Sequence, residues 1–327
     1  MAEMEKKPVI IDCDTGVDDA LALLLCLKRL DVVGITAVGG NVGLATTQRN
    51  TRFVVETAGR MDVPVYAGYD RPMLVPLHDA SYVHGAGGLG DIEVPEPTKA
   101  LEKQHAVDFL IDTYMARDDV TLITLAPLTN IAHALLKEPK LAKRIPEILC
   151  MGGSTVGGNA TPTAEFNIFV DPEAAKIVFE SGIPIRMVGL NLTRQQVANQ
   201  EMGERVSAIQ NPAAQLAAQL YRGRRGKPGR DSFCDACAVM WMIDSSVITR
   251  SARMHVTIET KGEFTRGMTV CDLRPFKANR PEVDIEREWL FDPMPKGQDP
   301  NVEVALELDQ AAFDRTLLAV LEEYGQA

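Results

Sequence analysis

No stretch of this sequence is apolar for long enough to cross a bilayer, since the longest apolar run is the short segment Ala20–Leu27. The charged residues before Pro8 also lack the apolar stretch of a signal peptide. Cysteine is scarce, with six in 327 residues, which does not indicate a disulfide framework. These absences predict a cytoplasmic protein that does not contact membranes and keeps its thiols reduced.

Basic residues are in deficit. Lys and Arg number 34 against 45 Asp and Glu, which gives a formal net charge of −11. Binding of nucleic-acid phosphates needs a basic face, so this balance argues against nucleic acid as a partner. The sequence does have 46% hydrophobic and 24% charged residues, which is typical of a globular protein with a large buried core.

Short, β-rich apolar segments alternate with helical patterns up to about residue 190. This alternation is typical of βαβ units and predicts an α/β fold of the Rossmann-like type, with a mostly parallel central sheet flanked by helices. The predicted strands are Pro8–Ile11, Val32–Val38, Val63–Ala67, Val120–Leu125, Ile148–Met151 and Ile183–Val188.

The C-terminal third is expected to be more irregular. Its candidate elements are the helices Ala213–Tyr221 and Ala236–Ile243, the strands Arg253–Glu259 and Val302–Leu308, and a last helix capped by Asp309. Arg222–Arg230, rich in Arg and Gly, is predicted to be a surface loop, and Phe276–Asn301 a long excursion. With neither linker nor repeat, residues 1–327 are predicted to form one domain.

Four acidic residues crowd the end of the first predicted strand: Asp12, Asp14, Asp18 and Asp19. A helix N-terminus stabilises a carboxylate by about 0.3–1 kcal/mol, which accounts for one or two of them. Four would repel one another, and burial would raise their pKa values unless a cation lay among them. A hard divalent cation with oxygen ligands is therefore predicted here.

Two other interpretations of this cluster are open to comparison. An EF-hand loop starting at Asp12 fails, because its required Gly and Glu positions are Val17 and Leu23. The segment Asp12–Thr15 is also similar to the start of haloacid-dehalogenase-like phosphatases, in which Asp12 would be the nucleophile beside magnesium. That alternative predicts a second acidic pair at a later strand end, and the sequence offers no convincing one.

The other predicted strands end in polar turns. Gly39-Gly40-Asn41, Ala126–Asn130 and Met151-Gly152-Gly153 each follow a strand. Because parallel strands bring their carboxyl ends to one edge of a sheet, these turns are expected to meet the acidic cluster there. The later segments Gly158–Asn167 and Cys234–Cys237 add further polar residues.

Taken together, these motifs resemble the inosine-uridine preferring nucleoside hydrolase family. The resemblance runs from about Pro8 to Met268 and rests on DxDxGxDDA, GGN, PLTNIA, MGG and NxxxxxEFNxxxDPEAA in the family's order. It implies a single α/β domain, a bound Ca²⁺, and hydrolysis of the ribose–base N-glycosidic bond of ribonucleosides. It also implies a homodimer or a homotetramer. Nothing in the motifs separates purine from pyrimidine preference.

The resemblance also implies roles for particular residues. Calcium would lie between Asp14, Asp19, Asp235 and the backbone carbonyl at about Leu125, with Asp14 as the general base towards a water that calcium holds. The substrate-binding residues would be Asp18, Asn41, His84, Met151, Asn159, Glu165, Phe166, Asn167 and Asp235. Among these, the acids and amides would bind the ribose, Met151 and Phe166 would make apolar contacts, and His84 would lie near the 5′ side or the base.

Cys234 departs from the residue that many members of this family carry. They place a His before the calcium-binding Asp, to assist the leaving base, whereas this chain resembles the cysteine-bearing subgroup. A thiol donates weakly, so Cys234 is either a catalytic acid or a small spacer. If turnover has been lost with the His, the chain would be a non-catalytic nucleoside-binding protein. The pair Cys234–Cys237 alone is a weak signal for zinc.

Overall fold

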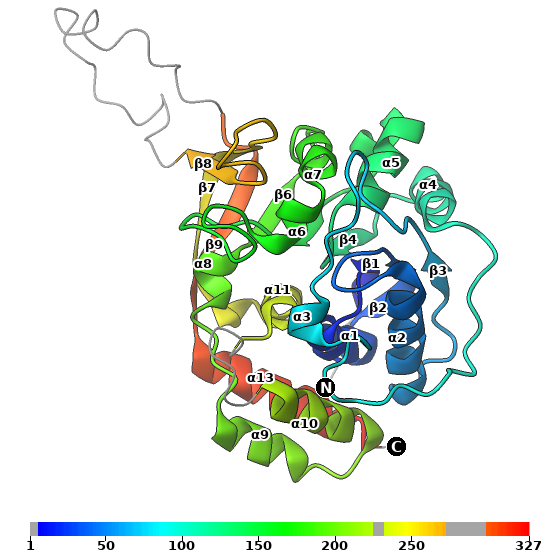
Figure 1. The fold of residues 1–327 in the computed structure, drawn as a ribbon. Helices are drawn as coiled ribbons and strands as arrows, with labels where there is room; N and C mark the ends of the chain where they lie inside the picture. The colour runs from blue at the N-terminus through cyan, green and yellow to red at the C-terminus, as the bar shows by residue number, and fades with distance from the viewer. Residues whose placement is uncertain (1–5, 225–231, 273–298, 327) are drawn as a thin grey trace, which may run out of the picture.

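The computed structural model describes residues 6–224, 232–272 and 299–326. Within them a nine-stranded sheet has the order β3-β2-β1-β4-β5-β6-β9-β7-β8 (Figure 1). The strands are β1 (Pro8–Cys13), β2 (Asp31–Ala37), β3 (Val65–Ala67), β4 (Thr121–Thr124), β5 (Ile148–Met151), β6 (Ile185–Val188), β7 (Ile248–Ile258), β8 (Thr269–Asp272) and β9 (Val302–Leu308).

Pairing is parallel from β3 through to β9, and β7 runs antiparallel to both β9 and β8. This confirms the predicted α/β fold with a mostly parallel sheet. The central strands are buried on both faces: in β1, Val9 and Ile11 belong to one hydrophobic cluster and Ile10 to the other. That double burial explains why these strands read as continuous apolar runs rather than as alternating patterns.

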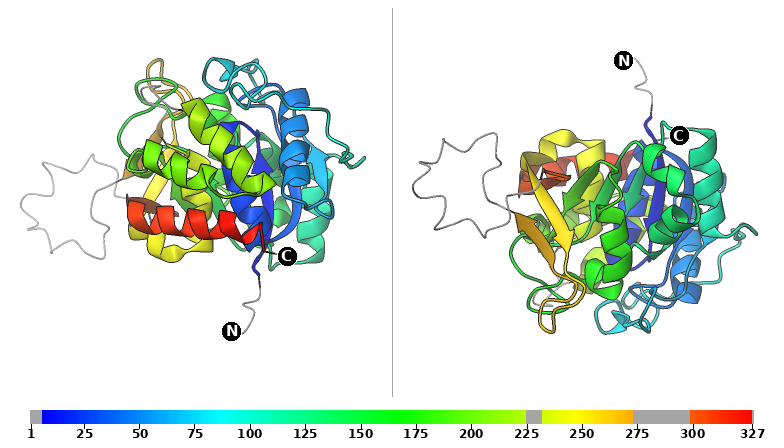
Figure 2. Two further views of the ribbon diagram at one scale, coloured as in Figure 1. Left: turned by 90° about the horizontal axis from the view of Figure 1, so that it is seen from below. Right: turned by 90° about the horizontal axis from the view of Figure 1, so that it is seen from above.

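Helices cover both faces of the sheet (Figure 2). The cluster around Val9 includes residues of α1 (Val17–Arg29), α2 (Leu44–Thr57), α8 (Leu190–Thr193), α9 (Gln200–Ser207), α10 (Pro212–Arg224), α11 (Cys234–Ile243) and α13 (Gln310–Glu323). The cluster around Ile10 includes residues of α4 (Ala106–Ala116), α5 (Thr129–Lys137), η1 (Pro139–Lys143), α6 (Phe166–Val170) and α7 (Pro172–Phe179). The short α3 (Ser81–His84) and η2 (Ser245–Val247) complete the described helices.

The C-terminal third differs from the sequence prediction in three places. The strand predicted from Arg253 already begins at Ile248, and β8 was not predicted. Helix α10 continues to Arg224, so the prediction of a loop from Arg222 was wrong for its first residues, because the Ala- and Leu-rich helix before them extends through Gly223. The rest of that segment, and most of Phe276–Asn301, lies outside the described residues. Asp309 caps α13 as predicted, accepting a 3.0 Å hydrogen bond from the N–H of Ala312.

The order of the strands defines where a ligand fits. The chain builds β1, β2 and β3 outward in one direction and then returns to form β4 on the other side of β1. At such a switch point the loops after the two strands diverge and leave a crevice at their carboxyl ends. No helix in the described ranges has the length and apolar character needed to cross a membrane.

Candidate active site

A cavity of about 260 Å³ lies at the carboxyl ends of the parallel strands. Eleven of the residues proposed from the sequence line it: Asp18, Asn41, His84, Leu125, Met151, Asn159, Glu165, Phe166, Asn167, Cys234 and Asp235. Asp14 and Asp19 are fully buried and do not line it. The remaining lining residues are Ala80, Tyr82, Val83 and Ala160. The structure therefore brings the sequence candidates to one site.

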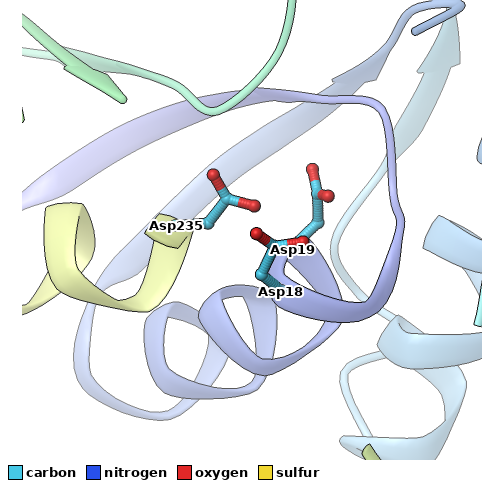
Figure 3. A group of neighbouring side chains, drawn as sticks. All are labelled: Asp18, Asp19 and Asp235. Carbon is cyan, nitrogen blue, oxygen red and sulfur yellow. The ribbon is translucent and has the colours of Figure 1, made fainter. Parts of the chain in front are cut away.

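Three carboxylates gather at this cavity from two helices (Figure 3). Asp18 and Asp19 lie in the first turn of α1, and Asp235 lies in the first turn of α11, which packs against α1. One carboxylate oxygen of each lies within 4.8 Å of those of the other two, a grouping that can hold a metal ion. The N-terminus of each helix stabilises a negatively charged carboxylate, although less strongly than a bound cation would.

Asp14 joins this cluster through Asn41. The main-chain N–H of Asn41 donates to Oδ2 of Asp14 at 2.6 Å, and its side-chain amide donates to Oδ1 of Asp14 at 3.1 Å and to Oδ2 of Asp19 at 3.0 Å. Asp19 also accepts the N–H of Asp14 at 3.2 Å and that of Gly16 at 2.9 Å. The turn before Asn41 needs Gly40, because a Cβ there would overlap the Asp14 carboxylate.

Burial and mutual repulsion raise the pKa values of these acids and so favour their protonated forms. Burial, and then the negative charge of Asp19, raises the pKa of Asp14 well above its usual range, and the same two causes raise the pKa of Asp235. Burial and the charge of Asp18 raise the pKa of Asp19 to about 6. No Lys or Arg is among the described residues that line the cavity. The nearest basic side chain among the described residues is that of His84, whose Nδ1 lies 3.9 Å from Oδ1 of Asp18. Carboxylate oxygens gathered in this way fit a hard divalent cation, which would stabilise all of them in the ionised form.

The opposite wall of the cavity is organised by Glu165, which caps α6. Its carboxylate accepts the N–H groups of Asn167 at 3.0 Å, Ile168 at 3.2 Å and Gly153 at 2.9 Å. Burial raises the pKa of Glu165 to about 7, against the lowering effect of these three donors.

Two amide side chains complete that wall. Asn159 Oδ1 accepts the N–H of Phe166 at 2.9 Å, which ties the loop to the start of α6. The amide of Asn167 donates to the carbonyl oxygens of Leu125 at 2.9 Å and Met151 at 3.2 Å. The Leu125 carbonyl, which was predicted as a metal ligand, is thus held by Asn167 directly after β4.

His84 and Cys234, which can each carry a proton, also line the cavity. The Nδ1 atom of His84 accepts the N–H of Val17 at 3.2 Å, so the neutral ring carries its proton on Nε2. The Cys234 thiol donates to Oγ1 of Thr193 at 3.4 Å. Thr193 was not among the sequence candidates, although it follows β6 at the same edge of the sheet and could have been found by that position. Cys237 is buried in α11 and does not line the cavity.

Asp12 is not placed to act as a nucleophile. It is fully buried, its Oδ1 accepts bonds from Thr36 at 2.5 Å and Asn130 at 2.8 Å, and it does not line the cavity. The geometry therefore gives no support to the phosphatase alternative.

The fold and the cavity define an α/β protein of the doubly wound type, with an acidic strand-end site that can hold a metal ion. A sequence profile described as inosine-uridine preferring nucleoside hydrolase matches residues 9–315. The chain belongs to this family, and it is accordingly an enzyme that hydrolyses the N-glycosidic bond of ribonucleosides.

Individual relatives agree over nearly the full length. The inosine-uridine preferring nucleoside hydrolase of Crithidia fasciculata is 38% identical over 317 residues, which cover 90% of this chain and 99% of the relative. The pyrimidine-specific ribonucleoside hydrolase RihA of Escherichia coli (strain SMS-3-5 / SECEC) is 38% identical over 303 residues, which cover 87% of this chain and 96% of the relative. The solved structure of a purine-preferring ribonucleoside hydrolase from Gardnerella vaginalis covers 98% of this chain and 99% of its own, with 29% identity and a TM-score of 0.83.

Proposed function

We propose that this chain is a calcium-dependent hydrolase of inosine- and uridine-type ribonucleosides, with Ca²⁺ held by Asp14, Asp19, Asp235 and the Leu125 carbonyl. The supporting observation is the cluster of carboxylates at a cavity whose described lining residues include neither Lys nor Arg. Asp18 shares that cluster, and Asp14 is bonded to it through Asn41. When bound, calcium would supply the positive charge that favours loss of a proton from water at neutral pH.

Asp14 is the proposed general base. In the reaction the ribose C1′–N bond breaks and a C1′–O bond to water forms, while Asp14 accepts the proton that water loses. Asn41 donates to both of its oxygens, which orients the carboxylate and favours its ionised form.

The acids and amides around the cavity are proposed to bind the sugar hydroxyls. As the base departs, the ribose gains oxocarbenium character, and neighbouring carboxylates stabilise that positive charge. The proposed ribose ligands are Asp18, Asn41, Asn159, Glu165, Asn167 and Asp235, with apolar contacts from Met151 and Phe166.

The departing base takes the electron pair of the broken bond and needs a proton. The lining groups that could deliver one include the Nε2–H of His84 and the thiol of Cys234. In this structure the Cys234 thiol is directed at Thr193. We therefore propose that Cys234 shapes the cavity and is secondary as an acid.

Base preference requires a direct comparison, since RihA is described as pyrimidine-specific and the Gardnerella vaginalis enzyme as purine-preferring. We further propose that residues 1–327 form one domain, that the protein is cytoplasmic, and that it assembles as a homodimer or a homotetramer. Light scattering after size exclusion measures the assembly.

The deciding experiment incubates the purified protein with inosine, uridine and a nucleotide, with added calcium or with a chelator. Free base, reducing sugar and phosphate are then measured. We expect base and ribose in equal amounts from at least one nucleoside, activity lost on chelation and restored by calcium, and no phosphate. Phosphate release would instead favour the Asp12 phosphohydrolase, and binding without base release would favour a nucleoside-binding protein.

A further inference from the structure

The loop between β5 and α6, residues 152–165, is held from outside by the hairpin of β7 and β8. This loop contains Asn159 and ends at Glu165. Thr163 Oγ1 donates to the carbonyl of Phe264 in the hairpin turn at 2.9 Å. A Cβ on Gly267, at the other end of that turn, would lie 2.9 Å from Cα of Phe169 in α6. The hairpin and the wall of the cavity are therefore in close contact.

The tightest link is made by Thr269, the first residue of β8. Its side chain is buried, and its single hydroxyl accepts the N–H of Ser154 at 2.8 Å and donates to the carbonyl of Ser154 at 2.7 Å. One hydroxyl thus satisfies both main-chain groups of a loop residue.

Thr269 also packs against Gly153, which precedes Ser154. Gly153 has φ +71°, and a Cβ on it would lie 2.5 Å from the methyl carbon of Thr269. In this left-handed conformation its N–H donates to Oε2 of Glu165 at 2.9 Å. The direction of that N–H depends on the backbone that Thr269 holds.

We propose that Thr269 is a positioning residue for Glu165, acting through the backbone of Gly153 and Ser154. This inference rests on the proposed function, in which Glu165 binds a ribose hydroxyl. Without the Thr269 hydroxyl, the N–H of Ser154 loses the hydroxyl that accepts it, and its carbonyl keeps only the long contact with the Cys271 thiol, at 3.9 Å. The loop must then shift to satisfy these main-chain groups. Glu165 then still accepts the main-chain N–H groups of Asn167 and Ile168, but the N–H of Gly153 no longer points at it in a fixed direction.

The test compares Thr269→Val, which keeps the shape and removes the hydroxyl, with Thr269→Ser, which keeps the hydroxyl. We expect Thr269→Val to lower kcat/KM for the better of inosine and uridine by roughly 10- to 100-fold, as misplacement of a binding group does. Thr269→Ser should restore most of the activity. Thr257→Val is the matched control. Thr257 lies on the neighbouring strand β7, opposite Val270, and its hydroxyl donates to the exposed Glu180 at 3.5 Å, away from the cavity wall.

Two further readouts separate positioning from general destabilisation. In a double-mutant cycle, Thr269→Val should lower kcat/KM much less in a Glu165→Gln background than in the wild type, since both changes act on the same carboxylate. Among 2′-, 3′- and 5′-deoxynucleosides, Thr269→Val should weaken discrimination against the same analogue as Glu165→Gln. Loss of stability alone would lower activity on all analogues alike.

The inference is overturned if Thr269→Val retains wild-type kcat/KM. It is likewise overturned if Thr269→Val lowers kcat/KM by the same factor in the Glu165→Gln background as in the wild type. It is also overturned if the discrimination among deoxynucleosides does not change. A wild-type protein that releases no base from any nucleoside overturns the proposed function and this inference together, whereas an active wild type with an unaffected Thr269→Val overturns only the inference.

Discussion

Asn41 binds both oxygens of Asp14, with its main-chain N–H at 2.6 Å from Oδ2 and its side-chain amide at 3.1 Å from Oδ1. The same amide lies 3.0 Å from Oδ2 of Asp19. One neutral residue therefore donates to two buried carboxylates that lie next to each other. Donors of this kind favour the ionised acids, against the effect of burial.

This relationship predicts a strong effect for Asn41→Asp. The substitution keeps the shape but replaces the two N–H donors by a further carboxylate oxygen. We expect the chelated protein to lose about 3 kcal/mol or more in free energy of unfolding, because the side-chain amide that donates to both acids is replaced by a further buried acid. Asn41→Ala removes the side-chain donors without adding an acid, so it should lower the free energy of unfolding by less. Urea unfolding in chelator measures both, and equal stability of wild type and Asn41→Asp would contradict the expectation.

A second prediction concerns the general base. Asp14→Asn should lower kcat by about 100-fold or more, the usual effect of losing a positioned base. Asp12→Asn is the matched control, since Asp12 is an equally buried carboxylate two residues earlier whose bonds go to Thr36 and Asn130. Base release is measured at saturating calcium, so that weakened metal binding is separated from lost chemistry. An Asp14→Asn enzyme with near-normal kcat removes Asp14 from this role.

Much of the fold was predictable, because its strands are short, doubly buried apolar runs. Val302–Leu308 was predicted with the bounds that β9 has in the structure. Strand β8 was missed, since its four residues, Thr269–Asp272, carry no periodic pattern and form a strand only by pairing with β7. Pairing between distant segments is a tertiary effect that local sequence does not encode.

The place of the site was predictable, because motifs at strand ends must meet at one edge of a parallel sheet, whereas the individual site residues followed from the resemblance to the family. The supporting contacts were not. Thr193 is hydrogen-bonded to Cys234, 41 positions away in the sequence, and Thr269 to Ser154, 115 positions away. Such contacts depend on where loops fold back, and a single Thr in a sequence gives no signal for its partner. The motif also did not indicate that Asp18 lies with Asp19 and Asp235 in a group of carboxylates that can hold a metal ion.

A third prediction separates the two roles left open for Cys234. Its thiol donates to Thr193, so we expect Cys234→Ser, which keeps a donor, to be nearly as active as the wild type. Cys234→Ala should lose less than about 100-fold, the lower limit expected for an essential acid. The measurement compares inosine with 4-nitrophenyl riboside, whose leaving group needs no proton. A large loss on inosine but none on the nitrophenyl substrate would establish Cys234 as the acid.

The fourth prediction concerns pH and the removal of calcium. In the metal-free protein, burial raises the pKa of Asp19 to about 6 and the pKa of Asp14 and Asp235 well above the usual range. Between the unfolded value near 3.8 and these folded values, the folded state binds more protons than the unfolded state. The stability of the chelated protein should therefore fall as pH rises through this window. Each proton involved contributes a slope of about 1.4 kcal/mol per pH unit.

Calcium reverses this dependence, because it binds the ionised carboxylates and competes with their protons. The gain in melting temperature on adding calcium should thus be small at pH 5 and large at pH 8, and the apparent affinity for calcium should rise with pH. Asp235→Asn, which removes one ligand and one repulsive charge, should reduce that gain while making the chelated protein more stable at pH 8. Thermal unfolding of both proteins with calcium and with chelator, at pH 5, 6.5 and 8, checks the sign. A chelated wild type that becomes more stable from pH 5 to pH 8 would show that these acids are ionised without a metal, and the argument for a cation among them would fail.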